Sequence, residues 1–202
     1  MARREPAPSR AWQRMLSGRR LDLLDPSPLD VEIEDVAHGL ARVARWNGQT
    51  SGPHIFSVAQ HSLLVEAIAQ DLRTGLPART GLAVLLHDAA EYVIGDMISP
   101  FKAVIGPSYK DVEHRILAAI MIRFGLPAAM SREVAALAKE ADRIAAHHEA
   151  VNLAGFSEEE AGRYFGAYVH LRLDSRALLA PMGAEEAKSR FLDRFTALLE
   201  LC

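Results

Sequence analysis

The chain has 202 residues, half of them hydrophobic, which is enough to bury one sizeable core. Its 23 Lys and Arg residues stand against 26 Asp and Glu residues, a formal net charge of −3 that argues against a nucleic acid polymer or a membrane surface as partner. No apolar run approaches the roughly 20 residues that span a bilayer. With Cys202 as its one cysteine, the chain forms no intrachain disulfide, and we expect a reducing compartment, the cytoplasm.

The first 30 residues are expected to form a basic segment outside the main domain. The first twenty hold six Arg and one Glu. This bias is shared with transit peptides, but a basic surface segment is the simpler interpretation. We therefore expect an N-terminal segment over residues 1–30 and one folded domain over residues 31–202.

Apolar residues recur at helical spacing through most of residues 31–202. Ser108 followed by Asp111 predicts a capping box that starts a helix ending at Gly125, and Ser157 with Glu160 repeats the pattern. Alternation over residues 168–173 makes a short strand one interpretation of that segment. Helices are predicted over residues 33–43, 58–72, 78–93, 108–124, 134–144 and 191–198. The expected fold is an all-α, single-domain helical bundle.

Four polar residues within apolar segments form a candidate metal-ligand set. His61 fills a gap in the apolar stripe of residues 58–72, and the adjacent His87 and Asp88 follow five apolar residues. An ionised Asp in such surroundings is costly unless a cation or hydrogen bonds compensate it. Two imidazoles and two carboxylates, the set being completed by Asp142, suit a borderline or hard divalent cation.

These residues lie in four short motifs that resemble a known family. The motifs are SVAQHS at residues 57–62, LLHDAAE at residues 85–91, GDMISPFK at residues 95–102 and EAD at residues 140–142. In this order they resemble the HD-domain phosphohydrolases. The match is closest to the bacterial 5′-deoxyribonucleotidases and the related phage-type deoxynucleoside triphosphatases, and it covers residues 35–153. The resemblance implies a helical bundle of the HD-domain type.

The resemblance also implies that His61, His87, Asp88 and Asp142 coordinate one divalent metal ion, with Co, Mn, Mg, Zn, Fe and Ni all open as its identity. Four protein ligands on a cation of coordination number about six leave positions for water and phosphate oxygen. Dinuclear members of the superfamily use extra histidines between the HD pair and the last Asp, where this chain has only His114. His147 and His148 follow Asp142 and are interpreted as helix-surface residues or as neighbours of the ligands.

Two further carboxylates are candidates for catalysis. On a continuous helix Glu91 would lie one turn beyond His87, near the metal, where it can exchange a proton with water or the leaving group. The alternative is an ordinary half-exposed helix Glu. The resemblance places Asp96 beside the catalytic Glu, whereas a simple helix cap explains its position after Gly95 equally well.

Substrate contacts are predicted at four residues. By resemblance Arg45 holds a phosphate and Trp46 packs on the sugar, which would favour deoxyribose because a 2′-hydroxyl against an apolar ring has no partner. Simple core packing is the alternative for Trp46. Lys102 is a second phosphate candidate, and His54 lies in the loop before the first ligand. That loop, residues 47–53, is longer than in the monophosphatases.

The expected function is metal-dependent removal of phosphate from a 5′-(deoxy)ribonucleoside monophosphate, a small-molecule substrate. The nearest alternative is a deoxynucleoside triphosphate triphosphohydrolase, which uses the same metal and water. Two alternatives come from other classes. A di-iron oxygenase would need additional histidines, and a non-catalytic nucleotide- or metal-binding module would be favoured if Glu91 or a ligand were missing. Relatives of this kind make a homodimer a reasonable expectation.

Overall fold

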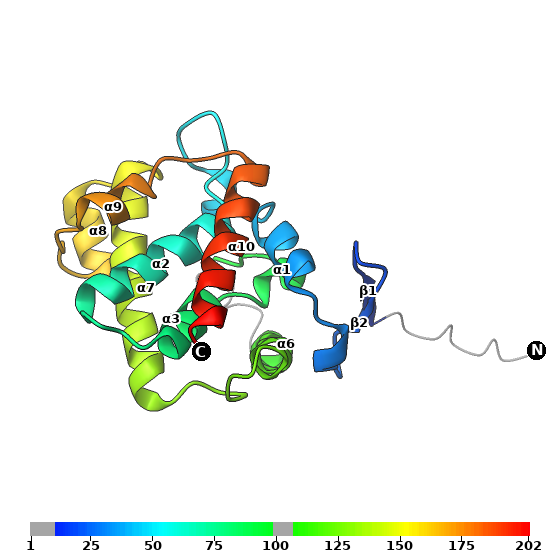
Figure 1. Cartoon of the computed structure of the whole chain (residues 1–202). Helices are drawn as coiled ribbons and strands as arrows, with labels where there is room; N and C mark the ends of the chain where they lie inside the picture. Colours follow the sequence, from blue (N-terminus) through cyan, green and yellow to red (C-terminus); the bar gives the residue numbers. More distant parts are fainter. Residues whose placement is uncertain (1–10, 99–106) are drawn as a thin grey trace, which may run out of the picture.

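The computed structural model describes residues 11–98 and 107–202, and this part of the chain is all-α apart from one short hairpin (Figure 1). Within it, no helix combines the length and apolar character needed to cross a membrane. In chain order the elements are β1 (Trp12–Arg14), β2 (Arg20–Asp22), η1 (Pro28–Asp30), α1 (Ile33–Leu40), η2 (Arg45–Gly48), α2 (Val58–Leu72), α3 (Ala78–Leu85), α4 (Glu91–Ile94), α6 (Pro107–Arg123), α7 (Arg132–Asn152), α8 (Glu158–Phe165), α9 (Leu173–Ala177) and α10 (Ala184–Glu200).

Helix α2 is the central element, and its bounds match the prediction over residues 58–72. The Ser57 side chain caps its first turn by accepting a hydrogen bond from the Gln60 amide. The helix packs against α7, α3 and α10, which surround it in Figure 1. Because apolar neighbours cover it on several sides, even polar side chains on α2 are enclosed. His61 is fully buried and Glu66 nearly so, with the latter paired to Arg194 of α10.

The helix predicted over residues 78–93 is interrupted, so that prediction was wrong in its continuity. Helix α3 ends at Leu85, a turn follows, and α4 begins at Glu91. In the turn, the amide of His87 donates to the Val84 carbonyl and that of Glu91 to the Asp88 carbonyl, so the bonds reach back three residues instead of four. A nearly continuous apolar run predicts burial correctly but contains no period from which the break could be located.

Helix α7 begins two residues before the predicted residues 134–144 and continues eight residues beyond them, to Asn152. Ser131 caps its start by accepting from the Val134 amide. The predicted capping box of Ser157 and Glu160 is confirmed at the start of α8, with both reciprocal bonds present. The Ser108 box is not confirmed, because α6 already includes Pro107 and Ser108 is its second residue rather than its cap.

The strand predicted over residues 168–173 is wrong. Residues 168–172 have no regular secondary structure, and Leu173 begins the short helix α9. A strand needs a partner for its backbone groups, and in the described chain the named strands pair only with each other. The segment between α8 and α9 is instead bound by two buried histidines of α7, His147 at the Gly166 carbonyl and His148 at the Val169 carbonyl.

The N-terminal segment contains an antiparallel hairpin of β1 and β2 that composition did not predict. Leu21 is fully buried and belongs to the main hydrophobic cluster. The turn is attached to α1 through Ser17, whose amide and hydroxyl both donate to the buried carboxylate of Asp35, at 3.0 and 2.5 Å. Residues 11–30 are therefore anchored to the helical part by packing and by hydrogen bonds. Residues 1–10 lie outside the described chain.

Close packing of α1 on α4 gives the first prediction. A Cβ atom at Gly39 would lie 2.7 Å from the backbone oxygen of Tyr92 and 2.8 Å from its Cβ. Gly39→Ala should therefore displace α4 and lower the free energy of unfolding by about 2 kcal/mol, the cost of overpacking. In α8, a Cβ at Gly162 meets nothing within 4 Å, so Gly162→Ala should instead stabilise by about 0.5–1 kcal/mol. Urea unfolding of both variants measures the difference, and equal effects would contradict the packing argument.

Candidate metal centre

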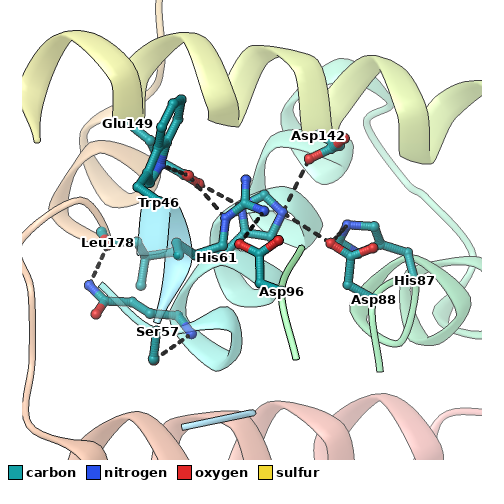
Figure 2. A network of polar contacts seen from close by, with 11 residues as sticks. Trp46, Ser57, His61, His87, Asp88, Asp96, Asp142, Glu149 and Leu178 are labelled. Atoms are coloured by element: carbon teal, nitrogen blue, oxygen red, sulfur yellow. Dashed lines mark hydrogen bonds and ion pairs between the residues drawn. The ribbon is translucent and has the colours of Figure 1, made fainter. Parts of the chain in front are cut away.

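Four side chains predicted as ligands meet at one place in the fold. One potential ligand atom from each of His61, His87, Asp88 and Asp142 lies within 4.8 Å of those of the other three. His61 comes from α2, His87 and Asp88 from the turn after α3, and Asp142 from α7. Figure 2 shows the four groups pointing toward one another. The arrangement can hold a metal ion, and three parts of the chain must be folded together for it to exist.

The distances between these groups define a compact centre. His61 Nε2 lies 3.2 Å from Asp142 Oδ1 and 3.6 Å from Asp88 Oδ2. His87 Nε2 lies 3.2 Å from the same Asp88 oxygen, and the two imidazole centroids are 5.4 Å apart. The histidines are the enclosed side of the centre, while the side chains of Asp88 and Asp142 are 26% and 41% exposed. Solvent therefore reaches the centre from the carboxylate side.

Both imidazoles are held in the orientation that a metal ligand requires. His87 Nδ1 is 2.9 Å from the Val84 carbonyl, and His61 Nδ1 is 2.5 Å from Glu149 Oε1. Since a carbonyl or carboxylate only accepts, Nδ1 donates in each ring, which leaves Nε2 as the nitrogen available to a metal ion. Each Nε2 is buried, and in the described chain the groups it faces are the carboxylates of the centre itself, at 3.2 to 3.6 Å. Metal-binding histidines have this pattern, so the donor set fits a divalent ion.

The acidic groups of the centre stay ionised despite their burial. Burial alone would raise the pKa of Asp88, but His87 and His61 hold it well below its usual range. The pKa of Asp142 is also lowered, because the His61 ring outweighs the effect of burial. For His61, burial and Arg45 would lower the pKa, yet the carboxylates of Glu149, Asp142 and Asp88 raise it well above the ordinary value. The centre is therefore a concentration of negative charge.

Glu149 is a central residue of the site that the sequence analysis missed. It is fully buried, and its two oxygens bind His61, Arg45 and Trp46. Burial would raise the pKa of Glu149, but Arg45 and His61 lower it to about 2. A signal was present in the sequence, because Glu149 follows Asp142 by seven residues and so lies on the same face of α7. Figure 2 shows both side chains descending from that helix.

Arg45 is enclosed by carboxylates. Its side chain is only 13% exposed, with Nη1 3.2 Å from Asp96 Oδ2 and Nε 3.2 Å from Glu149 Oε2. Burial would lower the pKa of Arg45, but Glu149 and Asp96 raise it above the ordinary value. Asp96, predicted to shape the site or to cap a helix, therefore binds the arginine predicted to hold phosphate.

Trp46 belongs to a small aromatic cluster beside the centre. Its ring lies 5.6 Å from the centroids of both Phe156 and Phe165, which come from the start and end of the α8 region. Its indole Nε1 donates to Glu149 Oε2 at 2.9 Å. The backbone at Trp46 and Asn47 is in the left-handed region, with φ of 57° and 50°. Such values are costly for residues that carry a Cβ and are frequent at functional sites.

The other predicted site residues are placed less centrally. Glu91 begins α4 directly after the ligand turn and is 2% exposed, so it is not the half-exposed helix residue of the alternative interpretation. His54 is exposed and outside the ligand group. Lys102 lies outside the described residues. His147 and His148 are buried and bind loop carbonyls, which corrects their interpretation as helix-surface residues.

Comparison with known proteins identifies relatives of unknown activity. No family model matches the chain. It is 59% identical over 157 residues to the uncharacterized protein RCAP_rcc00048 of Rhodobacter capsulatus, covering 78% of this chain and 80% of that protein. It is 31% identical over 172 residues to the uncharacterized protein YfdR of Escherichia coli K12, covering 85% of this chain and 86% of that protein. The chain belongs to the family of these two proteins. Their names assign it no reaction, so its chemistry must be argued from the centre itself.

Removing a ligand tests the metal centre. His87→Ala or Asp88→Ala should abolish binding of a divalent metal, because each removes one of four donors and Asp88 also supplies anionic charge. Helical circular dichroism should be retained. The matched control is His114→Ala, which changes an exposed histidine of α6. Metal content measured by mass spectrometry after equilibrium dialysis should fall in the first two variants and not in the control. Full metal occupancy in either ligand variant would refute the centre.

Proposed function

We propose that the chain is a metal-dependent phosphohydrolase of the HD-domain type that releases inorganic phosphate from 5′-(deoxy)ribonucleoside monophosphates. The observation that carries this proposal is the four-ligand centre, in which two buried Nε2 atoms face two ionised carboxylates that solvent can reach. Its ligands stand in the order, and with the motifs, by which the sequence resembles that superfamily. The histidines close the centre on one side, and solvent reaches it on the carboxylate side. This arrangement suits hydrolysis of a substrate that enters from solvent.

The residues of the centre would have different roles in hydrolysis. A divalent metal bound there would supply Lewis-acid activation of a phosphate ester. His61 and His87 would hold it through Nε2, while Asp88 and Asp142 offset its charge through their oxygens. Because Asp142 is the most exposed of the four side chains, we place the substrate phosphate on its side of the centre.

Glu91 is assigned the proton transfers. Its backbone amide donates to the Asp88 carbonyl at 3.0 Å, which fixes the first residue of α4 next to the ligand turn. As a base it takes a proton from the water that attacks phosphorus. The new P–O bond forms as the bond from phosphorus to the 5′ oxygen breaks, and the protonated Glu91 returns its proton to that oxygen. The products are inorganic phosphate and a nucleoside.

Substrate recognition is assigned to Arg45 and Trp46. Two guanidinium nitrogens of Arg45 already bind carboxylates. Among the described residues no acceptor is bonded to the third, Nη2, so its N–H groups and the second N–H of Nη1 would be the donors to a phosphate. Trp46, supported by Phe156 and Phe165, supplies an apolar wall for the sugar.

Product analysis tests the reaction. Purified protein should be incubated with ribo- and deoxynucleoside mono- and triphosphates in the presence of Mg²⁺, Mn²⁺, Co²⁺, Zn²⁺, Ni²⁺ or Fe²⁺. We expect single phosphate from the monophosphates, with deoxy substrates preferred. Triphosphate as the initial product would instead establish the triphosphohydrolase. Absence of any phosphate release from a metal-loaded protein would reject phosphohydrolysis.

Glu91→Gln separates proton transfer from metal binding. The substitution keeps the shape of the side chain but removes the base, so turnover should fall by about 10²- to 10⁴-fold with metal content unchanged. The matched control is Glu66→Gln, another buried glutamate, whose partner Arg194 lies on α10. This control should keep its turnover. Loss of the metal together with activity in Glu91→Gln would identify Glu91 as a ligand.

A further inference from the structure

The carboxylate of Glu149 connects the metal centre, through His61, with the predicted substrate contacts, Arg45 and Trp46. The proposed reaction does not by itself require this connection. Its Oε1 accepts from His61 Nδ1 at 2.5 Å, on the side of the imidazole opposite the metal-facing Nε2. Its Oε2 accepts from Trp46 Nε1 at 2.9 Å and from Arg45 Nε at 3.2 Å. All of these contacts are inside the protein, since Glu149 is fully buried. Figure 2 shows the carboxylate between the indole and the His61 ring.

The Arg45–Gly48 turn has a backbone conformation that needs external support. Trp46, Asn47 and Gly48 have successive φ values of 57°, 50° and 74°. Only the last of these residues adopts a left-handed conformation without steric cost. Two backbone bonds hold the turn, from the Arg45 amide to the Phe56 carbonyl at 2.8 Å and from the Gln49 amide to the Trp46 carbonyl at 2.9 Å. Its side-chain support comes from the Phe156 and Phe165 rings and from Glu149.

We propose that Glu149 is a positioning residue that couples the metal centre to the conformation of the Arg45–Trp46 turn. Its two oxygens belong to one planar group, so displacement of one moves the other. A metal ion bound to His61 Nε2 fixes the ring, the ring fixes Oε1, and Oε2 then holds the indole and the guanidinium. The predicted substrate wall and the metal site are thus organised together. In the other direction, a correctly formed turn orients His61 for the metal.

A simpler role for Glu149 predicts different behaviour. A carboxylate that only neutralised the buried Arg45 would affect stability, but it would transmit nothing between the metal and Trp46. The coupling proposed here rests on the metal centre and not on the proposed reaction. Metal binding and tryptophan emission can both be measured without a nucleotide, so failure of phosphate release would leave this inference testable.

Fluorescence of Trp46 provides a direct readout. The chain has two tryptophans, and Trp12→Phe leaves Trp46 as the one emitter. In this background, Zn²⁺ should shift the Trp46 emission as it saturates the centre. Adding Glu149→Gln should weaken Zn²⁺ binding by about 10- to 100-fold, as loss of a residue that orients a ligand does, and should abolish the emission shift at saturating Zn²⁺. Glu66→Gln, the buried-glutamate control, should preserve both the affinity and the shift.

A second variant tests the coupling from the other end. Trp46→Phe keeps an aromatic ring against Phe156 and Phe165 but removes the N–H that binds Glu149. Its Zn²⁺ affinity, measured by competition with a chromophoric chelator, should fall by up to about tenfold, although Trp46 is not a ligand. Trp12→Phe is the matched control and should bind Zn²⁺ as the parent does. The inference is overturned if Trp46→Phe binds Zn²⁺ as tightly as the parent, or if Glu149→Gln retains both parental affinity and the emission shift.

Discussion

Burial of negative charge around His61 is the constraint on which the rest of the site depends. The carboxylates of Asp88, Asp142 and Glu149 surround this fully buried ring, and the one guanidinium bound to them in the described chain, Arg45, is shared with a further carboxylate. Enclosing a fully buried charge such as that of Glu149 without compensation costs several kcal/mol, whereas Asp88 and Asp142 remain partly exposed. A divalent cation between the two Nε2 atoms and the two ligand carboxylates would offset the excess. The negative charge of the centre thus favours binding of a divalent cation.

The fold places each part of this centre on a differently supported element. His61 lies on α2, which α3, α7 and α10 enclose, so its ring has little freedom to move. Helix α7 provides both Asp142 and Glu149 from one face, so a single helix supplies one candidate ligand and the carboxylate that binds another, His61. In contrast to His61 and Asp142, which lie on helices, His87 and Asp88 lie in a turn. A turn of i→i−3 bonds can direct two adjacent side chains toward one point, whereas neighbours on a regular helix diverge by about 100°.

Sequence reasoning located His61, His87 and Asp88 as candidate ligands because they interrupt apolar patterns, and Asp142 through the order of the family motifs. His61 filled a gap in a helical stripe, and the bounds of α2 followed from that stripe and its Ser57 cap. The break after Leu85 was not predictable, because a run that is apolar throughout carries no period. Glu149 was missed because a buried acid looks like a surface residue until its partners, Arg45 and Trp46, are known to lie nearby. Arg45 and Trp46 precede Glu149 in the chain by 104 and 103 residues, respectively.

The structure changes the meaning of the Arg45–Trp46 pair. From sequence, the pair was expected to contact substrate, with core packing as the alternative for the ring. The contacts show Trp46 packed on Phe156 and Phe165 and both side chains bound to Glu149, while substrate contact stays a proposal. A group that must meet a ligand with defined geometry is best held by buried, charged hydrogen bonds, because these are strong and leave few alternative rotamers. The cost is a left-handed backbone at Trp46 and Asn47. Such strain persists only where the surroundings determine the conformation, and here Glu149, which binds both Trp46 and His61, is one of those determinants.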